Sequence, residues 1–163
     1  MILHHGSSVI VQHPEIMKSS RTLDFGYGFY TTTSHDQAYK WARIKANRDA
    51  TPSGFISTYE MDDRILSESS LHSHSFRGAS SEWLRFVINN RMKDGFAHTY
   101  DVVRGAVAND RVYACLNAFE NRFMSFEMAI QELRTYKLDD QVSFHTAKAL
   151  SYLHFISSEE VPL

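Results

Sequence analysis

Glycine and aromatic residues alternate in one short segment near the N-terminus, Phe25-Gly26-Tyr27-Gly28-Phe29-Tyr30. Glycine has no Cβ atom, so Gly26 and Gly28 leave the backbone exposed and permit a ligand to approach it closely. The segment does not match the dinucleotide fingerprint of a Rossmann fold, because the third glycine is absent and the next predicted helix begins too late. By itself the pattern predicts a glycine-rich turn that enters a short strand at residues 29–33.

Two other polar segments could supply side chains to a site. His5-Gly6-Ser7 follows a short apolar run and has the character of a polar strand end. Residues 139–145 alternate between polar and apolar, which places Gln141, Ser143 and His145 on one face of a predicted strand. That face would lie either at a solvent-exposed edge or on the floor of a cleft, and the alternation alone favours the exposed edge.

Neither a metal site nor a reactive cysteine is expected. His72-Ser73-His74 offers two imidazoles of the kind that bind zinc, but no Cys, Asp or third His lies at a matching spacing, so we predict a loop there. Cys115 is the single cysteine, which excludes a disulfide within the chain. It lies in an apolar segment with no adjacent base and is predicted to be part of the core.

The polar segments occur in an order that resembles a known superfamily. The segments are His5-Gly6-Ser7, residues 24–32, Gln37-Ala38 and residues 140–144. In this order they resemble the ADP-ribosyltransferase superfamily of the poly-ADP-ribose polymerase and diphtheria-toxin type. There a His-Gly-Ser strand precedes a Phe-Gly-x-Gly-Ile-Tyr-Phe-Ala segment, a helix begun by small residues, and a late strand that carries a glutamate.

The resemblance is closer to an uncharacterised bacterial family placed in that superfamily. Its members share Leu-Asp-Phe-Gly-x-Gly-Phe-Tyr-x-Thr and Asp-Gln-x-Ser-Phe-His-Thr, and both patterns occur here. This closer resemblance runs from Leu3 to about Phe155.

The resemblance implies that NAD is the co-substrate and that no metal is needed. His5 matches the histidine that hydrogen-bonds the adenosine ribose, and Gly6 matches the glycine whose backbone holds the nicotinamide carboxamide. Ser7 would line the same strand. Gly28 lies in the glycine segment, and Tyr30 matches the tyrosine that packs against nicotinamide.

Two further contacts with NAD are left open by the resemblance. A second aromatic residue usually stacks on the other face of nicotinamide, and either Tyr39 or Trp41 could fill that place. Arg21 precedes the glycine segment and could face the pyrophosphate as a bidentate donor. A surface arginine is an equally good interpretation of Arg21.

Gln141 occupies the position of the family's catalytic glutamate. Breaking the bond between nicotinamide and ribose builds positive charge on the ribose, as in glycoside hydrolysis. A carboxylate there binds the 2′-hydroxyl and stabilises the developing cation. Glutamine keeps a hydrogen bond but brings no charge. Asp139 or Asp140 could supply the charge, although strand alternation points Asp140 away from the face of Gln141.

The expected function is therefore mono-ADP-ribosyl transfer from NAD to a macromolecule, with His5, Tyr30 and Gln141 as catalytic residues. The acceptor could be protein, RNA or DNA, and a role as a bacterial toxin or phage-defence effector would imply an antitoxin partner. One alternative is a sensor that binds NAD or ADP-ribose without transfer. Another is an NAD hydrolase with water as the acceptor, and a purely structural role ranks last.

The remaining pattern predicts the elements that must position these residues. Ser34 with Gln37 three residues later is a capping-box signature, which begins a helix that runs to about Asn47. Its apolar stripe is predicted to be Ala38, Trp41 and Ala42. Further strands are expected at 2–5, 9–11, 55–61, 100–107, 139–145 and 152–156, and helices around Trp83, at 112–122 and at 125–136, with a turn at 6–8 and a loop at 67–80.

This irregular order predicts an α+β fold, a single domain over residues 1–163. We expect an ADP-ribosyltransferase-like split β-sheet core with flanking helices, in which two small sheets face each other and NAD binds between them. A length of 163 residues suits one domain.

Bulk charge and hydropathy exclude several classes of protein. The net charge is −2, whereas a protein that binds duplex nucleic acid by charge alone is usually far more basic. The basic residues Arg43, Lys45 and Arg48 are interpreted as a solvated helix face. No signal peptide is visible, and no apolar run approaches the ~20 residues of a membrane helix. A cytoplasmic protein without a membrane partner is expected.

Overall fold

The computed structural model describes residues 1–16, 18, 23–67, 70–93 and 95–163. These residues form an α+β fold, as predicted, with one mixed β-sheet of seven strands and flanking helices. The strands are β1 (Ile2–Ser7), β2 (Phe29–Thr32), β3 (Ser53–Glu60), β4 (Ser73–Ser75), β5 (Val102–Ala106), β6 (Asp140–Phe144) and β7 (His154–Pro162). The helices are α1 (His35–Asp49), α2 (Ser81–Met92), α3 (Asp110–Glu120), α4 (Phe126–Leu133), α5 (Ala147–Leu150) and the 3-10 helix η1 (Asp63–Leu66).

The sheet consists of two halves that meet at a single residue pair. Its strand order is β4-β5-β6-β2-β1-β3-β7, and every neighbouring pair is antiparallel except β4 with β5. All of β1 pairs with β3, whereas β1 pairs with β2 only at His4 and Thr32. Beyond that pair the two strands no longer pair, so the expected two separate sheets are in fact one sheet with a weak central join.

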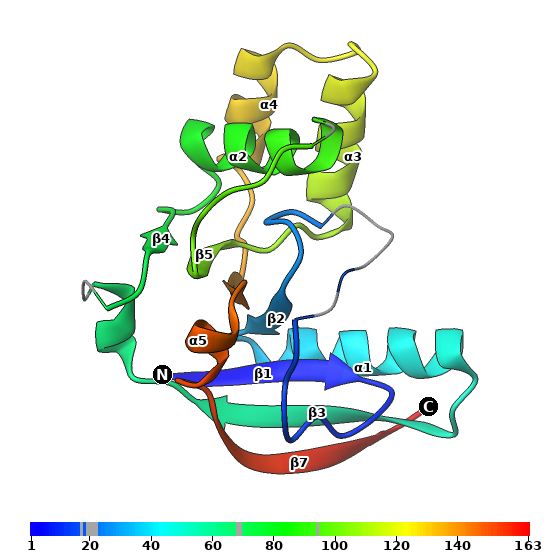
Figure 1. The fold of residues 1–163 in the computed structure, drawn as a ribbon. Helices are drawn as coiled ribbons and strands as arrows, with labels where there is room; N and C mark the ends of the chain where they lie inside the picture. The colour runs from blue at the N-terminus through cyan, green and yellow to red at the C-terminus, as the bar shows by residue number, and fades with distance from the viewer. Residues whose placement is uncertain (17, 19–22, 68–69, 94) are drawn as a thin grey trace.

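The two halves carry different helices (Figure 1). Helices α2, α3 and α4 gather at one end of the molecule beyond β5, and α1 lies along β1 and β3 at the other end. The aromatic core beneath α2–α4 includes Phe25 and Trp83, while a second core on the opposite face of the sheet includes Leu3, Phe29 and Phe144. Both faces of β6 are consequently covered.

Helix α1 begins where the capping box predicts. The Ser34 side chain accepts a hydrogen bond from the Gln37 amide at 3.3 Å, and Ala50 ends the helix in the left-handed conformation. The buried stripe is Ala38, Ala42 and Ala46. Trp41, which was predicted to belong to this stripe, is 41% exposed, because the stripe of small residues rotates it to the flank of the helix.

The small stripe of α1 packs directly on two glycines of the sheet. A Cβ atom added to Gly6 would lie 2.1 Å from the carbonyl oxygen of Ala38, and one added to Gly54 would lie 2.5 Å from that of Ala42. Only backbone and alanine methyl groups therefore separate α1 from β1 and β3. The fold itself requires glycine at position 6.

Three sequence predictions about the elements are wrong. Strand β1 continues through Gly6 and Ser7, which pair with Ile56 and Phe55 of β3, so no turn interrupts it. Residues 9–11 form no strand. The predicted loop at 67–80 contains β4, which pairs with β5 in parallel.

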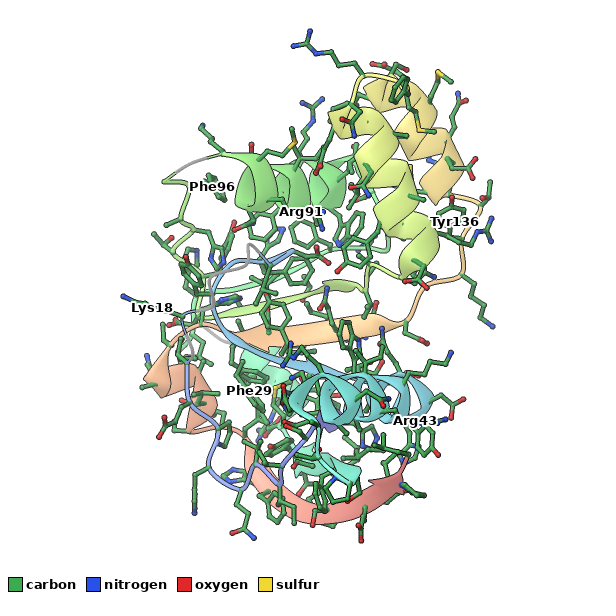
Figure 2. All side chains as sticks on the ribbon, turned by 90° about the vertical axis from the view of Figure 1, so that its right-hand side faces the viewer. Lys18, Phe29, Arg43, Arg91, Phe96 and Tyr136 are labelled. Carbon is green, nitrogen blue, oxygen red and sulfur yellow. The ribbon has the colours of Figure 1, made fainter. Side chains whose placement is uncertain are left out.

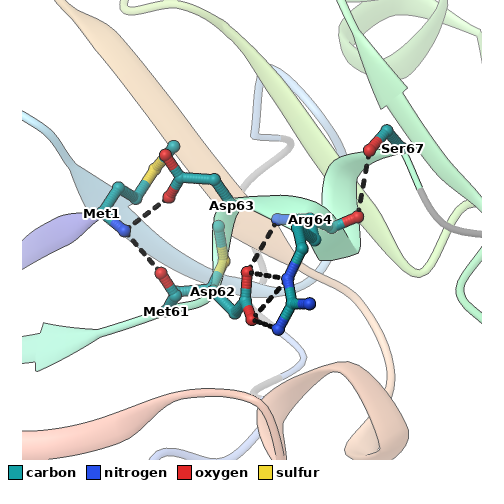
Figure 3. Close-up of polar contacts among 6 residues, drawn as sticks. All are labelled: Met1, Met61, Asp62, Asp63, Arg64 and Ser67. Carbon is teal, nitrogen blue, oxygen red and sulfur yellow. Dashed lines mark hydrogen bonds and ion pairs between the residues drawn. The ribbon is translucent and has the colours of Figure 1, made fainter.

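The start of β1 is tied to the segment that follows β3 (Figure 3). The Met1 amino group donates to the Met61 carbonyl and the Asp63 carboxylate. Asp62 caps η1 by accepting from the Arg64 backbone amide at 3.0 Å, and hydrogen bonds from Arg64 lower the pKa of the Asp62 carboxyl to about 2. Across the described part of the chain, no helix has the length and apolar character to cross a membrane.

Replacing Gly6 with alanine should destabilise the protein strongly, because the added methyl group would collide with rigid backbone of α1. We expect a loss of about 3 kcal/mol or more in the free energy of unfolding, at the upper end for overpacked sites. Chemical denaturation measures it. The matched control is Gly78→Ala, where an added Cβ meets nothing within 4 Å and only the positive φ of 64° is unfavourable. Equal losses in the two variants would contradict this account of α1 packing.

Candidate functional site

The three motif segments meet around β2. Thr32 pairs with Gln141 of β6, and Tyr30 pairs with Ser143 on the same face. On the other side of β2, the Nδ1 atom of His5 lies 2.7 Å from the carbonyl oxygen of Tyr30. The structure therefore brings together residues from positions 5, 30 and 141 at the point where β1 and β2 stop pairing.

His5 lies on the face of the sheet opposite α1. Its neighbour Gly6 faces α1, and successive side chains of a strand alternate between faces. The imidazole stacks on Phe29, with ring centroids 4.4 Å apart. Burial, aided by the charge of Lys45, lowers the pKa of His5 to about 3, so the ring is neutral at pH 7. Because the Tyr30 carbonyl only accepts, Nδ1 carries the proton and Nε2 is left as an acceptor.

Tyr30 anchors the glycine segment through its hydroxyl group. The hydroxyl donates to the Gly26 carbonyl at 2.6 Å and accepts from the Phe25 amide at 3.0 Å. Burial raises the pKa of Tyr30 well above its ordinary value, so the phenol stays protonated. The ring lies edge-on to His145, with centroids 6.3 Å apart.

Two histidines that the sequence analysis did not assign to the site hold the same segment. His98 Nε2 lies 2.7 Å from the Phe25 carbonyl, and His145 Nδ1 lies 2.7 Å from the Tyr27 carbonyl. His145 Nε2 also lies 2.8 Å from the Ser143 hydroxyl. Burial lowers the pKa of both imidazoles, that of His145 to about 4.

Gly28 permits the close contact between the glycine segment and β6. A Cβ atom at Gly28 would lie 2.6 Å from the Phe144 carbonyl oxygen and 2.8 Å from His145 Nδ1. The backbone of this glycine is therefore used in packing.

Gln141 is buried rather than at a solvent-exposed edge. It is 7% exposed, and its Nε2 donates to the Ala106 carbonyl at 3.2 Å. The expected exposed edge is wrong because the segment that contains Phe25 and the helices α2–α4 cover this face of β6. Asp140 points away, as alternation predicts, and pairs with Arg104 at 2.9 Å.

A buried carboxylate from the glycine motif lies beside Gln141. Asp24 is 7% exposed, and its Oδ1 lies 3.4 Å from Arg91 Nη1 (Figure 2 shows Arg91 between α2 and the sheet). Burial raises the pKa of Asp24, while the charge of Arg91 and its hydrogen bond to the carboxylate oppose that rise. Asp24 falls within the glycine motif, but its partner Arg91 is distant in sequence, so no local pattern predicts a role for it.

Tyr39 and Trp41 lie on opposite flanks of α1. Tyr39 packs against the small core cluster that joins α1 to β3 and β7, which consists of Ala38, Ala42, Ile56 and Val161. Trp41 follows Gln37 by one helical turn, and Gln37 Oε1 accepts from the Thr32 hydroxyl at 2.7 Å. Trp41 therefore lies on the flank toward β2, the same side as Gln141.

The remaining predicted residues are placed as follows. Ser7 is buried at the end of β1. Arg21 lies outside the described residues. His72 and His74 contact Thr99 and Glu82, and within the described ranges no group of three or more His, Cys, Asp or Glu side chains could hold a metal ion.

The described surface has two open depressions away from the motif residues. One, of about 460 Å³, is lined by residues 10–13, and the other, of about 470 Å³, lies between α2 and the α3–α4 turn. Neither is lined by His5, Tyr30 or Gln141.

Stability should fall as the pH drops below about 6.5. The pKa of His145, about 4, and that of His5, about 3, lie below the unfolded value of 6.5, so the unfolded chain binds more protons in that window. His145→Gln should reduce the slope of the unfolding free energy against pH by about 1.4 kcal/mol per pH unit. This is the slope expected when the unfolded chain binds one more proton than the folded protein. Urea unfolding between neutral pH and ~pH 5 measures it. An unchanged slope would show that His145 titrates normally in the fold.

Comparison with known proteins gives a family and no activity. No curated protein and no solved structure matches the chain. One family model does match, under the description "Protein of unknown function (DUF3990)", and it covers residues 1–155. The chain therefore belongs to the DUF3990 family.

Proposed function

We propose that this protein is an NAD-dependent mono-ADP-ribosyltransferase that modifies a macromolecule. The observation that supports the proposal is that all three motif segments meet at β2: His5 contacts the Tyr30 backbone carbonyl from one face, and Tyr30 and Gln141 lie on the other face. These residues match the superfamily's motifs in sequence order, and Gln141 is more than a hundred positions from the other two.

The contacts of each residue are compatible with a part of this role. His5 offers a neutral imidazole with Nε2 as an acceptor, which suits a ribose hydroxyl. Gln141 and Tyr30 share a face of the sheet, and Trp41 lies on the flank of α1 toward that face. Trp41 is therefore our candidate for the second aromatic residue that stacks on nicotinamide, in preference to Tyr39.

The proposed reaction breaks the glycosidic bond between nicotinamide and the ribose C1′ atom. The bonding electrons leave with nicotinamide, which becomes neutral, and a nucleophile of the acceptor bonds to C1′ and loses a proton. Positive charge develops on the ribose in between, as in glycoside hydrolysis. A hydrogen bond from the 2′-hydroxyl to Gln141 would stabilise that state. We propose a toxin or phage-defence setting, with protein, RNA or DNA as the acceptor.

A second candidate function is an NAD or ADP-ribose sensor. The observation that favours it is the uncharged glutamine at the position where the superfamily has a glutamate. Incubation with labelled NAD and a cell lysate separates these functions. Label transferred to protein or nucleic acid indicates transfer, free ADP-ribose without labelled macromolecules indicates a hydrolase, and binding without nicotinamide release indicates a sensor.

NAD should bind and quench the fluorescence of Trp41. The other tryptophan, Trp83, is fully buried, so an exposed Trp41 reports on stacking by nicotinamide. A hundredfold excess of NAD over its dissociation constant should add about 2.7 kcal/mol to the free energy of unfolding. Trp41→Phe should abolish the quenching, and Tyr39→Phe should leave it intact. If millimolar NAD causes no quenching and no thermal shift, the proposal is contradicted.

Gln141→Ala should lower kcat for nicotinamide release far more than it changes KM for NAD. Losing one preorganised hydrogen-bonding group commonly costs ~10²–10³ in rate, and a bond that strengthens in the transition state affects kcat selectively. Steady-state kinetics measure both constants. Gln131→Ala, at an exposed position of α4, is the control. If the Gln141→Ala variant and the parent have equal kcat and KM values, Gln141 has no role in catalysis.

A further inference from the structure

Helix α1 concentrates positive charge that the proposed chemistry does not use. Four of the 17 lysine and arginine residues of the chain lie in the 15 residues of this helix, against two of the 19 acidic residues. The chain as a whole has a net charge of −2, so the excess of positive charge is local to α1. The four residues are Lys40, Arg43, Lys45 and Arg48.

Most of this charge is not neutralised by neighbouring acids. Lys40, Arg43 and Arg48 are exposed. Within the described residues, Arg48 is the one member of the four in an ion pair, with Asp49 at 3.1 Å. Asp36 precedes Lys40 by one helical turn and yet forms no ion pair with it in that part of the chain. A solvated helix face is usually laced by pairs of opposite charge, so these cations remain available to an anionic partner.

Two of the cations continue the flank of α1 that faces the candidate site. Gln37 accepts from the Thr32 hydroxyl of β2, and Trp41 follows one turn later on the same flank. Lys45 and Arg48 come four and seven residues after Trp41, a spacing that keeps them on this flank. Seven residues of helix span about 10 Å. A ligand bound at Arg48 can therefore extend to the Trp41 ring.

Exposed apolar side chains lie among the cations. Trp41 is 41% exposed and Ile44 is 53% exposed. Proteins that bind single-stranded nucleic acid combine cations for the backbone phosphates with apolar side chains on which the flat bases stack. Arginine suits both parts, because its planar guanidinium binds phosphate bidentately and also stacks on bases. An acidic peptide would match the charge of this surface but would leave its apolar side chains without flat partners.

The size of the charged surface suits a short stretch of one strand. From Lys40 to Arg48 the helix rises about 12 Å. A protein that binds a duplex by charge is usually far more basic than this chain. Outside α1, acidic residues outnumber basic ones, so the rest of the chain repels a polyanion and favours its approach over α1.

We propose that the acceptor is single-stranded nucleic acid, whose phosphates bind the cations of α1 and whose adjacent nucleotide enters the site beside Trp41. This inference rests on the proposed function, for which it names the class of acceptor. A nucleophilic nitrogen or oxygen of that nucleotide bonds to the ribose C1′ atom, and the bond from C1′ to nicotinamide breaks. The bonding electrons leave with nicotinamide, and the proton of the nucleophile passes to solvent.

Neutralising the exposed cations of α1 tests the inference. Labelled single-stranded oligonucleotides of mixed sequence, one DNA and one RNA, should show which strand binds the parent. With about three phosphates contacted, the logarithm of the affinity should fall with the logarithm of the salt concentration with a slope of about −2. The triple variant Lys40→Gln, Arg43→Gln, Arg48→Gln should bind at least tenfold more weakly, with a flatter slope. Its KM for the oligonucleotide as acceptor should rise by a similar factor.

Two further variants distinguish charge from folding. Arg77→Gln, Lys93→Gln, Arg134→Gln removes the same charge from exposed positions in the half of the molecule that carries α2–α4 (Figure 1), and it should match the parent. A variant that exchanges lysine and arginine at positions 40, 43 and 48 keeps the charge and should keep most of the affinity and the salt slope. Loss of binding in this charge-conserving variant as well would indicate a structural role and overturn the inference.

The other outcomes separate this inference from the proposed function. Transfer of label from NAD to protein alone would overturn the nucleic acid acceptor and leave the transferase proposal intact. Failure of the parent to bind either oligonucleotide, or equal binding and transfer by the parent and the triple variant, would overturn the role of α1. A parent protein that neither binds nor cleaves NAD would overturn both proposals.

Discussion

The direct contact between α1 and the sheet is the constraint on which the rest of the structure depends. Gly6 and Gly54 leave room for Ala38 and Ala42, and any larger residue at these glycines would meet backbone. The contact sets the rotation of α1 about its axis. That rotation turns Trp41 toward β2 and Tyr39 toward β3 and β7, and it leaves His5 on the opposite face of the sheet. A packing requirement thus decides which side chains can reach the candidate site.

The glycine segment depends on a second set of interactions, in which side chains replace a strand ladder. Buried backbone groups must be paired, and residues 25–27 have no neighbouring strand. Tyr30, His98 and His145 supply the missing partners for the Phe25 amide and for the carbonyls of Phe25, Gly26 and Tyr27. Since two of these partners are neutral histidines, acid weakens the clamp. The same clamp holds Asp24 in place above β6.

Local signals in the sequence were sufficient for some elements. The capping box predicts the start of α1 at the correct residue, and the alternation at 139–145 correctly divides β6 into two faces. Local sequence patterns gave wrong predictions where pairing between distant segments decides the structure. Gly6-Ser7-Ser8 has the composition of a turn, yet β3 extends β1 through Gly6 and Ser7. Alternation gave the face of Gln141 but not its burial, which depends on segments that are distant in the chain.

The site itself was only partly predictable for the same reason. Motif order indicated His5, Tyr30 and Gln141, and the structure places them around one strand. The Asp24–Arg91 pair joins residues 67 positions apart, and no local pattern marks either one as the partner of the other. Likewise, the choice between Tyr39 and Trp41 needs the rotation of α1, which depends on the glycines of other strands.

The charge balance around position 141 gives a physical reason for glutamine there. Asp24 and Glu120 already share the Arg91 guanidinium in a region that excludes water. A glutamate at 141 would add another buried carboxylate to this side of the sheet, and a nearby like charge raises the pKa of a carboxyl group. The Gln141 amide donates to the Ala106 carbonyl at 3.2 Å and adds no charge near the Asp24–Arg91 pair.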